Sequence, residues 1–165
     1  MIVARTSKGV VTTFPVAENQ HDQGILDVSI VPARISEATS QQARHMALSL
    51  AESLDYVGVL GVEMFVLDDD RLLINEIAPR PHNSGHYTLD ATASSQFEQQ
   101  VRTLCGLPPG DTRLLSPVVM INLLGDVWGD SEPDWRDLFA SPGVMLHLYG
   151  KASARPGRKM GHFNV

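Results

Sequence analysis

The 165-residue sequence contains one cysteine, Cys105. A single thiol excludes a disulfide within the chain and any metal site made of several cysteines, and it suits a reducing compartment. No run approaches the roughly 20 apolar residues that a membrane-spanning helix needs. The glycines show no G-x-G-x-x-G or Walker-type spacing, so the chain has no recognisable glycine-rich phosphate loop of its own. These absences predict a cytoplasmic protein that does not enter a membrane.

Charge and size narrow the class further. The formal charge of −6 argues against nonspecific binding of nucleic acid, which favours basic surfaces. The apolar fraction of 43% is enough to build a core. A chain of this length has room for one domain, or for one domain and a small appendage.

Two apolar segments, residues 62–67 and 72–77, each carry one glutamate and flank a short acidic turn. They predict a β-hairpin with these facing pairs: Leu67 with Leu72, Phe65 with Ile74, and Glu63 with Glu76. Facing side chains on neighbouring strands have Cβ atoms about 5 Å apart. Two carboxylates that close together, among apolar neighbours, repel unless they share a proton or hold a cation.

Mg²⁺ suits such a gap, because it prefers carboxylate oxygens and often also holds substrate phosphates. The hairpin therefore predicts Glu63 and Glu76 as metal ligands. The alternative is that both glutamates are solvated residues on a polar face. A shift of one residue in the register would separate them.

The segment after the hairpin, residues 77–87, leaves the sheet, since its two prolines cannot continue a central strand. Arg80 suits a bidentate contact with a phosphate or carboxylate, and Gly85 permits close approach of the backbone. The remaining polar side chains can form hydrogen bonds, and they are His82, Asn83, Ser84 and His86.

The spacing of apolar residues and the capping residues predict helices and strands on either side of the hairpin. A helix is predicted from the Ser36 cap to about residue 55, with an inward apolar stripe of Ala43, Met46, Ala47, Leu50, Ala51 and Leu54. A second helix is predicted after Ser95 and Glu98, which resemble a capping box. Its predicted inner face is Phe97, Val101, Leu104 and Cys105. Residues 18–23 are predicted to be a polar loop, and residues 117–124 and 143–149 are predicted to be strands.

The run N-E-I-A-P-R-P-H-N-S-G-H-Y-T from Asn75 to Thr88 resembles the 5-(carboxyamino)imidazole ribonucleotide synthases, ATP-grasp enzymes of purine biosynthesis. Residues 18–26, 95–101 and 155–162 resemble the same family. Ala78 stands where the wider ATP-grasp superfamily often has an Asn, which agrees with the narrower family. The order of predicted strands and helices indicates an α+β chain with a largely antiparallel sheet. The resemblance implies residues 1–113 as the C-terminal half of an ATP-grasp domain and residues 114–165 as a small β-rich module.

Family members also have a nucleotide-binding-like N-terminal domain, a glycine-rich lid and a strand that holds the adenine. All of these precede the part matched here. The resemblance therefore implies the C-terminal half of a larger enzyme, completed by a missing N-terminal half, and a homodimer as in many family members.

The same resemblance implies ATP and Mg²⁺ as cofactors and 5-aminoimidazole ribonucleotide and bicarbonate as substrates. Asn75, Glu76 and His21 would contact ATP, and Glu63 and Glu76 would hold the metal. Carboxyphosphate, the intermediate formed from bicarbonate and ATP, would be stabilised by Arg80, His82 and Asn83.

The tail is basic, with Lys151, Arg155, Arg158 and Lys159 within nine positions. It predicts either a solvated hairpin loop or a pocket for a phosphate monoester, since Lys supplies a point charge and Arg a planar fork. By resemblance, Lys151 and Arg158 bind the 5′-phosphate of the ribonucleotide. Arg155 and Lys159 either assist as further substrate contacts or are exposed. Two other functions remain open: an ATP-grasp formyl transferase of the same pathway, and a fragment that is catalytically silent without a partner chain.

Overall fold

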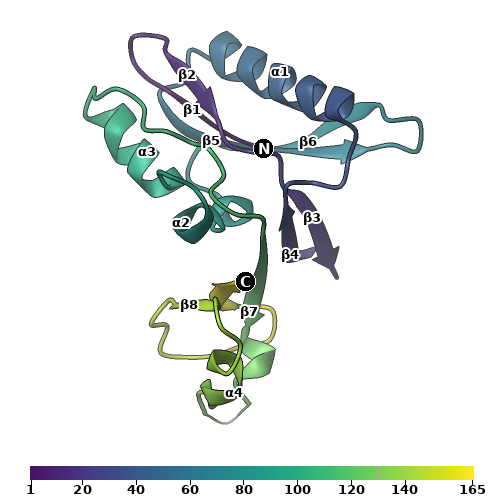
Figure 1. Cartoon of the computed structure of the whole chain (residues 1–165), viewed down its shortest axis with the longest axis vertical. Coiled ribbons are helices and arrows are strands. Elements are labelled where there is room, and N and C mark those ends of the chain that lie inside the picture. The colour runs from purple at the N-terminus through teal and green to yellow at the C-terminus, as the bar shows by residue number, and fades with distance from the viewer. Residues whose placement is uncertain (130) are drawn as a thin grey trace.

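The computed structural model describes residues 1–129 and 131–165. Two antiparallel sheets and several helices build it, which confirms the α+β class (Figure 1). The first sheet has the order β2-β1-β5-β6, formed by β1 (Ile2–Arg5), β2 (Val11–Thr13), β5 (Gly58–Val66) and β6 (Leu72–Ala78). The second has the order β3-β4-β7-β9-β8, formed by β3 (Glu18–Asp22), β4 (Ile25–Val31), β7 (Val118–Leu124), β8 (Met145–Leu148) and β9 (Lys159–Asn164). Within the described residues, no helix is long and apolar enough to cross a membrane.

Helix α1 (Glu37–Ser53) covers one face of the first sheet (Figure 1). The Ser36 hydroxyl accepts a hydrogen bond from the Thr39 backbone N–H, as the predicted cap requires. Ala43, Ala47 and Ala51 are buried against strands of the first sheet, which confirms the main part of the predicted stripe. The prediction was wrong only at Leu54, which is 55% exposed at the C-cap.

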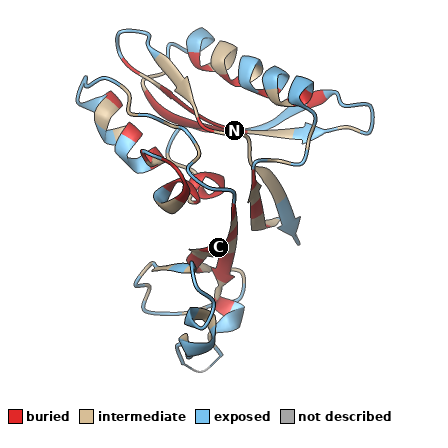
Figure 2. Cartoon of the chain, in the orientation of Figure 1, coloured by how far each residue is buried: buried red, intermediate tan, exposed pale blue. Residues whose placement is uncertain are grey.

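Helix α3 (Gln96–Leu104) lies on the opposite side of that sheet, and its predicted inner face was wrong. Val101, Leu104 and Cys105 are exposed, whereas its buried positions are polar (Figure 2). The Gln99 side-chain amide donates to the Gly110 carbonyl and accepts from the Gly110 N–H. The Gln100 side-chain oxygen accepts from the Val59 N–H at 2.7 Å. Glutamines occupy the inner face because they satisfy backbone groups that lie away from water.

The segment predicted to be a polar loop, residues 18–23, was also wrong, because residues 18–22 form strand β3. β3 pairs with β4, and β4 pairs with β7. The second sheet thus joins strands from both sides of the predicted domain boundary at residue 113, which stays a prediction. The shorter connections are η1 (Asn83–Gly85), α2 (Thr88–Ala91), η2 (Gly125–Val127) and α4 (Arg136–Phe139).

Candidate functional site

The two glutamates of the β5–β6 hairpin face each other. Glu63 pairs with Glu76, as predicted, but Met64 pairs with Ile74. Asn75 is therefore an extra residue on β6, a β-bulge. Bulges re-aim side chains and are common beside active sites. The bulge also made the two predicted outer pairs wrong, because Phe65 pairs with Leu73 and Val66 with Leu72.

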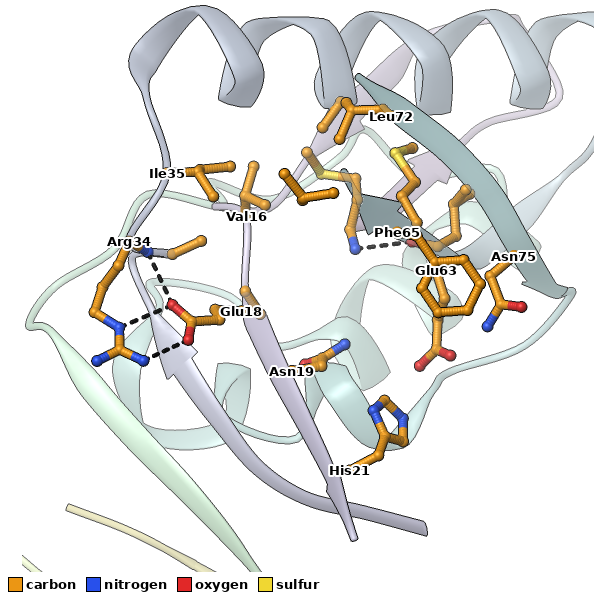
Figure 3. A pocket seen from close by; sticks show the side chains of 17 residues that line it. Val16, Glu18, Asn19, His21, Arg34, Ile35, Glu63, Phe65, Leu72 and Asn75 are labelled. Atoms are coloured by element: carbon orange, nitrogen blue, oxygen red, sulfur yellow. Dashed lines mark hydrogen bonds and ion pairs between the residues drawn. The ribbon is translucent and has the colours of Figure 1, made fainter. Parts of the chain in front are cut away.

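A cavity of about 680 Å³ lies beside the bulge (Figure 3). Its walls come from β5, β6, β3 and the segment before α1. Apolar side chains form much of the lining, namely Val16, Ile35, Met64, Phe65 and Leu72. Glu63, Asn75 and His21 reach it from three strands, so the structure brings these three predicted site residues together. Its dimensions and mixed lining suit an organic ligand with both apolar and charged parts.

An ion pair that the sequence did not indicate closes one side of this cavity. Arg34 binds both oxygens of the Glu18 carboxylate, with nitrogen–oxygen distances of 2.9 and 2.5 Å (Figure 3). Hydrogen bonds from Arg34 lower the pKa of Glu18 to about 2. Residues 18–23 had been predicted to be a loop, so nothing indicated that Glu18 would contact Arg34, which lies between β4 and α1.

His82 lies next to Glu63, with 3.8 Å between its Nδ1 atom and a carboxylate oxygen. Burial lowers the pKa of His82, although the nearby Glu63 carboxylate raises it. Gln96 holds the backbone of this residue from both sides. Its side-chain oxygen accepts from the His82 N–H at 2.9 Å, and its side-chain nitrogen donates to the His82 carbonyl at 2.7 Å.

Asn83 is buried beside His82, and both polar atoms of its side-chain amide lack a hydrogen-bond partner among the residues that the structure describes. Such groups are rare, since an unmade buried hydrogen bond costs about 1–3 kcal/mol. The hydrogen-bonding capacity of this amide is therefore unused by the described residues. Arg80, three residues earlier, is exposed, and among the described residues its guanidinium donates to the Pro81 carbonyl alone.

The two hydrogen bonds between the Gln96 side chain and the His82 backbone leave room only for glycine at position 85. A Cβ atom at this position would lie 2.5 Å from the Gln96 side-chain oxygen and 2.9 Å from a side-chain carbon of Ile2. We expect Gly85→Ala to lower the free energy of unfolding by about 1–3 kcal/mol, as is typical of overpacking. Unfolding by denaturant measures this free-energy difference. The loss should shrink when Gln96 is also replaced by alanine, and an equal loss in both backgrounds would contradict the clash.

Lys159 of the second sheet is influenced by the same glutamates. Burial lowers the pKa of the Lys159 ammonium on β9. The negative charges of Glu63 and Glu76 raise it, and the positive charges of Arg80 and Lys151 lower it further. The sequence left open whether Lys159 assists substrate binding or is simply exposed. In the structure it is half-buried near the predicted site residues Glu63, Glu76 and Arg80.

The other tail residues point in different directions. The Lys151 ammonium donates to the Lys159 carbonyl and lies 5.6 Å from the centre of the Tyr149 ring. The Arg158 guanidinium donates to the backbone and hydroxyl oxygens of Ser153, at 2.7 and 2.8 Å. Arg155 is exposed. The tail is therefore a folded, internally bonded loop.

The donor set around the hairpin fits one hard cation only in part. In the described part of the chain, no three His, Cys, Asp or Glu side chains form a complete metal-binding group. Mg²⁺ is nevertheless often coordinated by only one or two protein carboxylates, with substrate phosphates and water as its remaining ligands, and the facing pair would suit this role.

Comparison with known proteins shows the family. Residues 1–97 match the family model of the ATP-grasp domain, and residues 118–165 match that of the phosphoribosylaminoimidazole carboxylase C-terminal domain. The chain belongs to the ATP-grasp family. Similar proteins within that family include N5-carboxyaminoimidazole ribonucleotide synthases, which confirms the resemblance seen in the sequence.

Three of these relatives illustrate the likeness. The synthase of Bacillus subtilis is 52% identical over 162 residues, which are 98% of this chain and 42% of the relative. The Thermus thermophilus synthetase superposes with a TM-score of 0.91 at 43% identity, over 99% of this chain and 44% of the other. The Aspergillus clavatus synthase, in complex with ADP and 5-aminoimidazole ribonucleotide, has a TM-score of 0.92 at 39% identity, over 99% and 45%. This ATP-grasp chain thus spans less than half the length of these relatives.

Proposed function

We propose that this chain is the C-terminal part of a cytoplasmic enzyme that carboxylates 5-aminoimidazole ribonucleotide with bicarbonate and ATP. The products would be N-carboxyaminoimidazole ribonucleotide, ADP and phosphate. One observation carries the proposal: Glu63 lines the apolar cavity and faces Glu76, and the charges of both glutamates act on Lys159 of the second sheet. An ATP site and a ribonucleotide site would meet at such a place.

The cavity beside the bulge would hold part of ATP. Its apolar walls suit the nucleoside, and His21 and Asn75 would contact polar groups of the nucleotide. Glu63 and Glu76 would hold Mg²⁺, which when bound neutralises phosphate charge. A missing N-terminal half would complete the adenine pocket and the lid. The relatives are more than twice as long as this chain, which supports that part of the proposal.

The loop after β6 would bind bicarbonate and the carboxyphosphate formed from it. A bicarbonate oxygen attacks the γ-phosphorus of ATP, ADP leaves, and carboxyphosphate forms. Arg80 would neutralise the anion, and the Asn83 amide, which lacks a partner among the described residues, would bind an oxygen of it. His82 would donate a hydrogen bond from a fixed backbone position. Phosphoryl transfer needs mainly such positioning and charge neutralisation.

The tail would hold the second substrate. Lys151 and Arg158 would bind the 5′-phosphate of the ribonucleotide, and Arg155 would add positive charge. The amine then attacks the carboxyl carbon of carboxyphosphate, phosphate leaves, and the nitrogen loses a proton. We also propose a homodimer, as in many members of the family.

The test is ADP release by the full-length protein that carries this chain. We expect release to require bicarbonate and 5-aminoimidazole ribonucleotide together. The 165 residues alone should show negligible turnover, because they hold only part of the nucleotide site. Turnover with formate in place of bicarbonate would instead indicate the formyl transferase, and robust turnover by the 165 residues alone would contradict the need for a second half.

A further inference from the structure

Three histidines and a tyrosine join the loop after β6 to the second sheet. The Tyr149 hydroxyl lies 2.9 Å from Nδ1 of His86, three residues beyond Asn83. The same hydroxyl lies 2.8 Å from Nδ1 of His162 on β9. Tyr149 itself directly follows β8. One hydroxyl group therefore bridges two parts of the candidate site that are far apart in the sequence.

A second tie runs parallel to the first. The His162 ring stacks on His147, with centroids 4.6 Å apart and planes 13° from parallel. Nε2 of His147 lies 2.8 Å from the carboxylate of Asp90 on α2, and the Asn164 amide donates to the same carboxylate. Helix α2 follows the loop, so both ties connect the same two parts of the molecule.

The bridging rings are neutral at neutral pH. Burial lowers the pKa of His86 to about 3 and that of His162 to about 4. A neutral imidazole has one N–H and one bare nitrogen, and a hydroxyl donates one hydrogen bond while it accepts others. Tyr149 can therefore donate to one Nδ1 atom and accept from the other, so the three groups form one directed chain of hydrogen bonds.

Tyr149 also contacts the group that would bind the ribonucleotide. The Lys151 ammonium lies over its ring, and the Lys159 carbonyl accepts from that ammonium. Tyr149 therefore contacts both groups of residues that act in the proposed reaction. Its ring supports the lysine of the phosphate pocket, and its hydroxyl holds the loop of Arg80, His82 and Asn83.

We propose that Tyr149 is a positioning residue that keeps the carboxyphosphate loop aligned with Lys151, so that the ribonucleotide amine captures the carboxyl group before water does. The inference rests on the proposed function. Without this alignment, water attacks carboxyphosphate and returns bicarbonate and phosphate. ATP is then consumed, and no carbon–nitrogen bond forms.

The test is the ratio of ADP formed to carboxylated product formed in the full-length protein. Tyr149→Phe keeps the ring beneath Lys151 and removes only the hydroxyl. We expect the ratio to be near one in the wild type and to rise about two- to tenfold in the variant, the factor that the loss of one hydrogen bond implies. The KM for ATP should stay within about twofold, since one hydroxyl remote from the cavity is removed.

Tyr56→Phe is the matched control, because it removes a hydroxyl that donates to the Val59 carbonyl, away from the loop after β6. Its ratio should match the wild type. His86→Leu cuts the same link from the other side, because leucine has no polar atom in the place of Nδ1. It should also raise the ratio, which keeps the test decisive if the tyrosine variant does not fold.

A ratio of one in either folded variant, with turnover lowered or unchanged, would overturn the positioning role. A wild-type protein that releases no ADP in response to the ribonucleotide would overturn the proposed function, and this inference with it. The two failures are separate, because the first is seen only in the variants.

Discussion

Glu76→Gln should lower ATP turnover by the full-length protein about 10²-fold or more. The carboxylate faces Glu63 across the β5–β6 pair, and the pair would hold the Mg²⁺ that neutralises the phosphates of ATP. Glutamine has nearly the same shape but no negative charge, and removal of a single electrostatic contact in an active site typically costs a factor of 10²–10³. Glu76 is exposed, so we expect the fold to survive. ADP release measured across a Mg²⁺ titration checks the prediction.

The matched control is Glu52→Gln, on the exposed side of α1. Its turnover should equal that of the wild type at every Mg²⁺ concentration. Near-normal turnover of Glu76→Gln at saturating Mg²⁺ would contradict the ligand role, and the hairpin glutamates would then be a solvated pair on the polar face of the strands.

Lys151→Ala should raise the KM for 5-aminoimidazole ribonucleotide about 10- to 100-fold. Loss of one charge-assisted hydrogen bond to a phosphate costs about 1.5–3 kcal/mol, which corresponds to this range. The KM for ATP should change little, because Lys151 does not line the cavity proposed for the nucleotide. Initial rates measured with each substrate varied in turn give both constants.

Lys8→Ala removes an exposed lysine from the turn between β1 and β2 and serves as the control. It should leave both constants unchanged. Equal weakening of both substrates in Lys151→Ala would show that the lysine supports the fold of the module and does not bind phosphate.

Local sequence signals were sufficient where neighbours in the sequence are also neighbours in space. The Ser36 cap, the alanine stripe of α1 and the facing of Glu63 and Glu76 all follow from spacings of a few residues, and the structure confirms them. The detailed register beyond the glutamates was wrong, because nothing in the local pattern shows that Asn75 bulges out of β6.

Helix α3 shows the limit most clearly. Its apolar residues suggested the inner face, yet Val101 and Leu104 are exposed. The side that packs against the rest of the protein instead carries Gln96, Gln99 and Gln100. The reason is a polar requirement. The inner glutamines satisfy backbone groups of His82, Gly110 and Val59, which lie 14, 11 and 41 positions away along the chain. Periodicity of apolar residues carries no information about such distant backbone partners.

By itself, the amino-acid sequence determined the residue types of the site, the family, and the hairpin that sets two carboxylates opposite each other. Only the tertiary structure decided that β3 and β4 join the C-terminal strands in one sheet, and that Lys159 and Tyr149 thereby approach residues more than 60 positions earlier. The physical reason is that hydrogen bonds between edge strands and the burial of polar clusters depend on which surfaces meet, and these surfaces are assembled from segments that no short-range pattern connects.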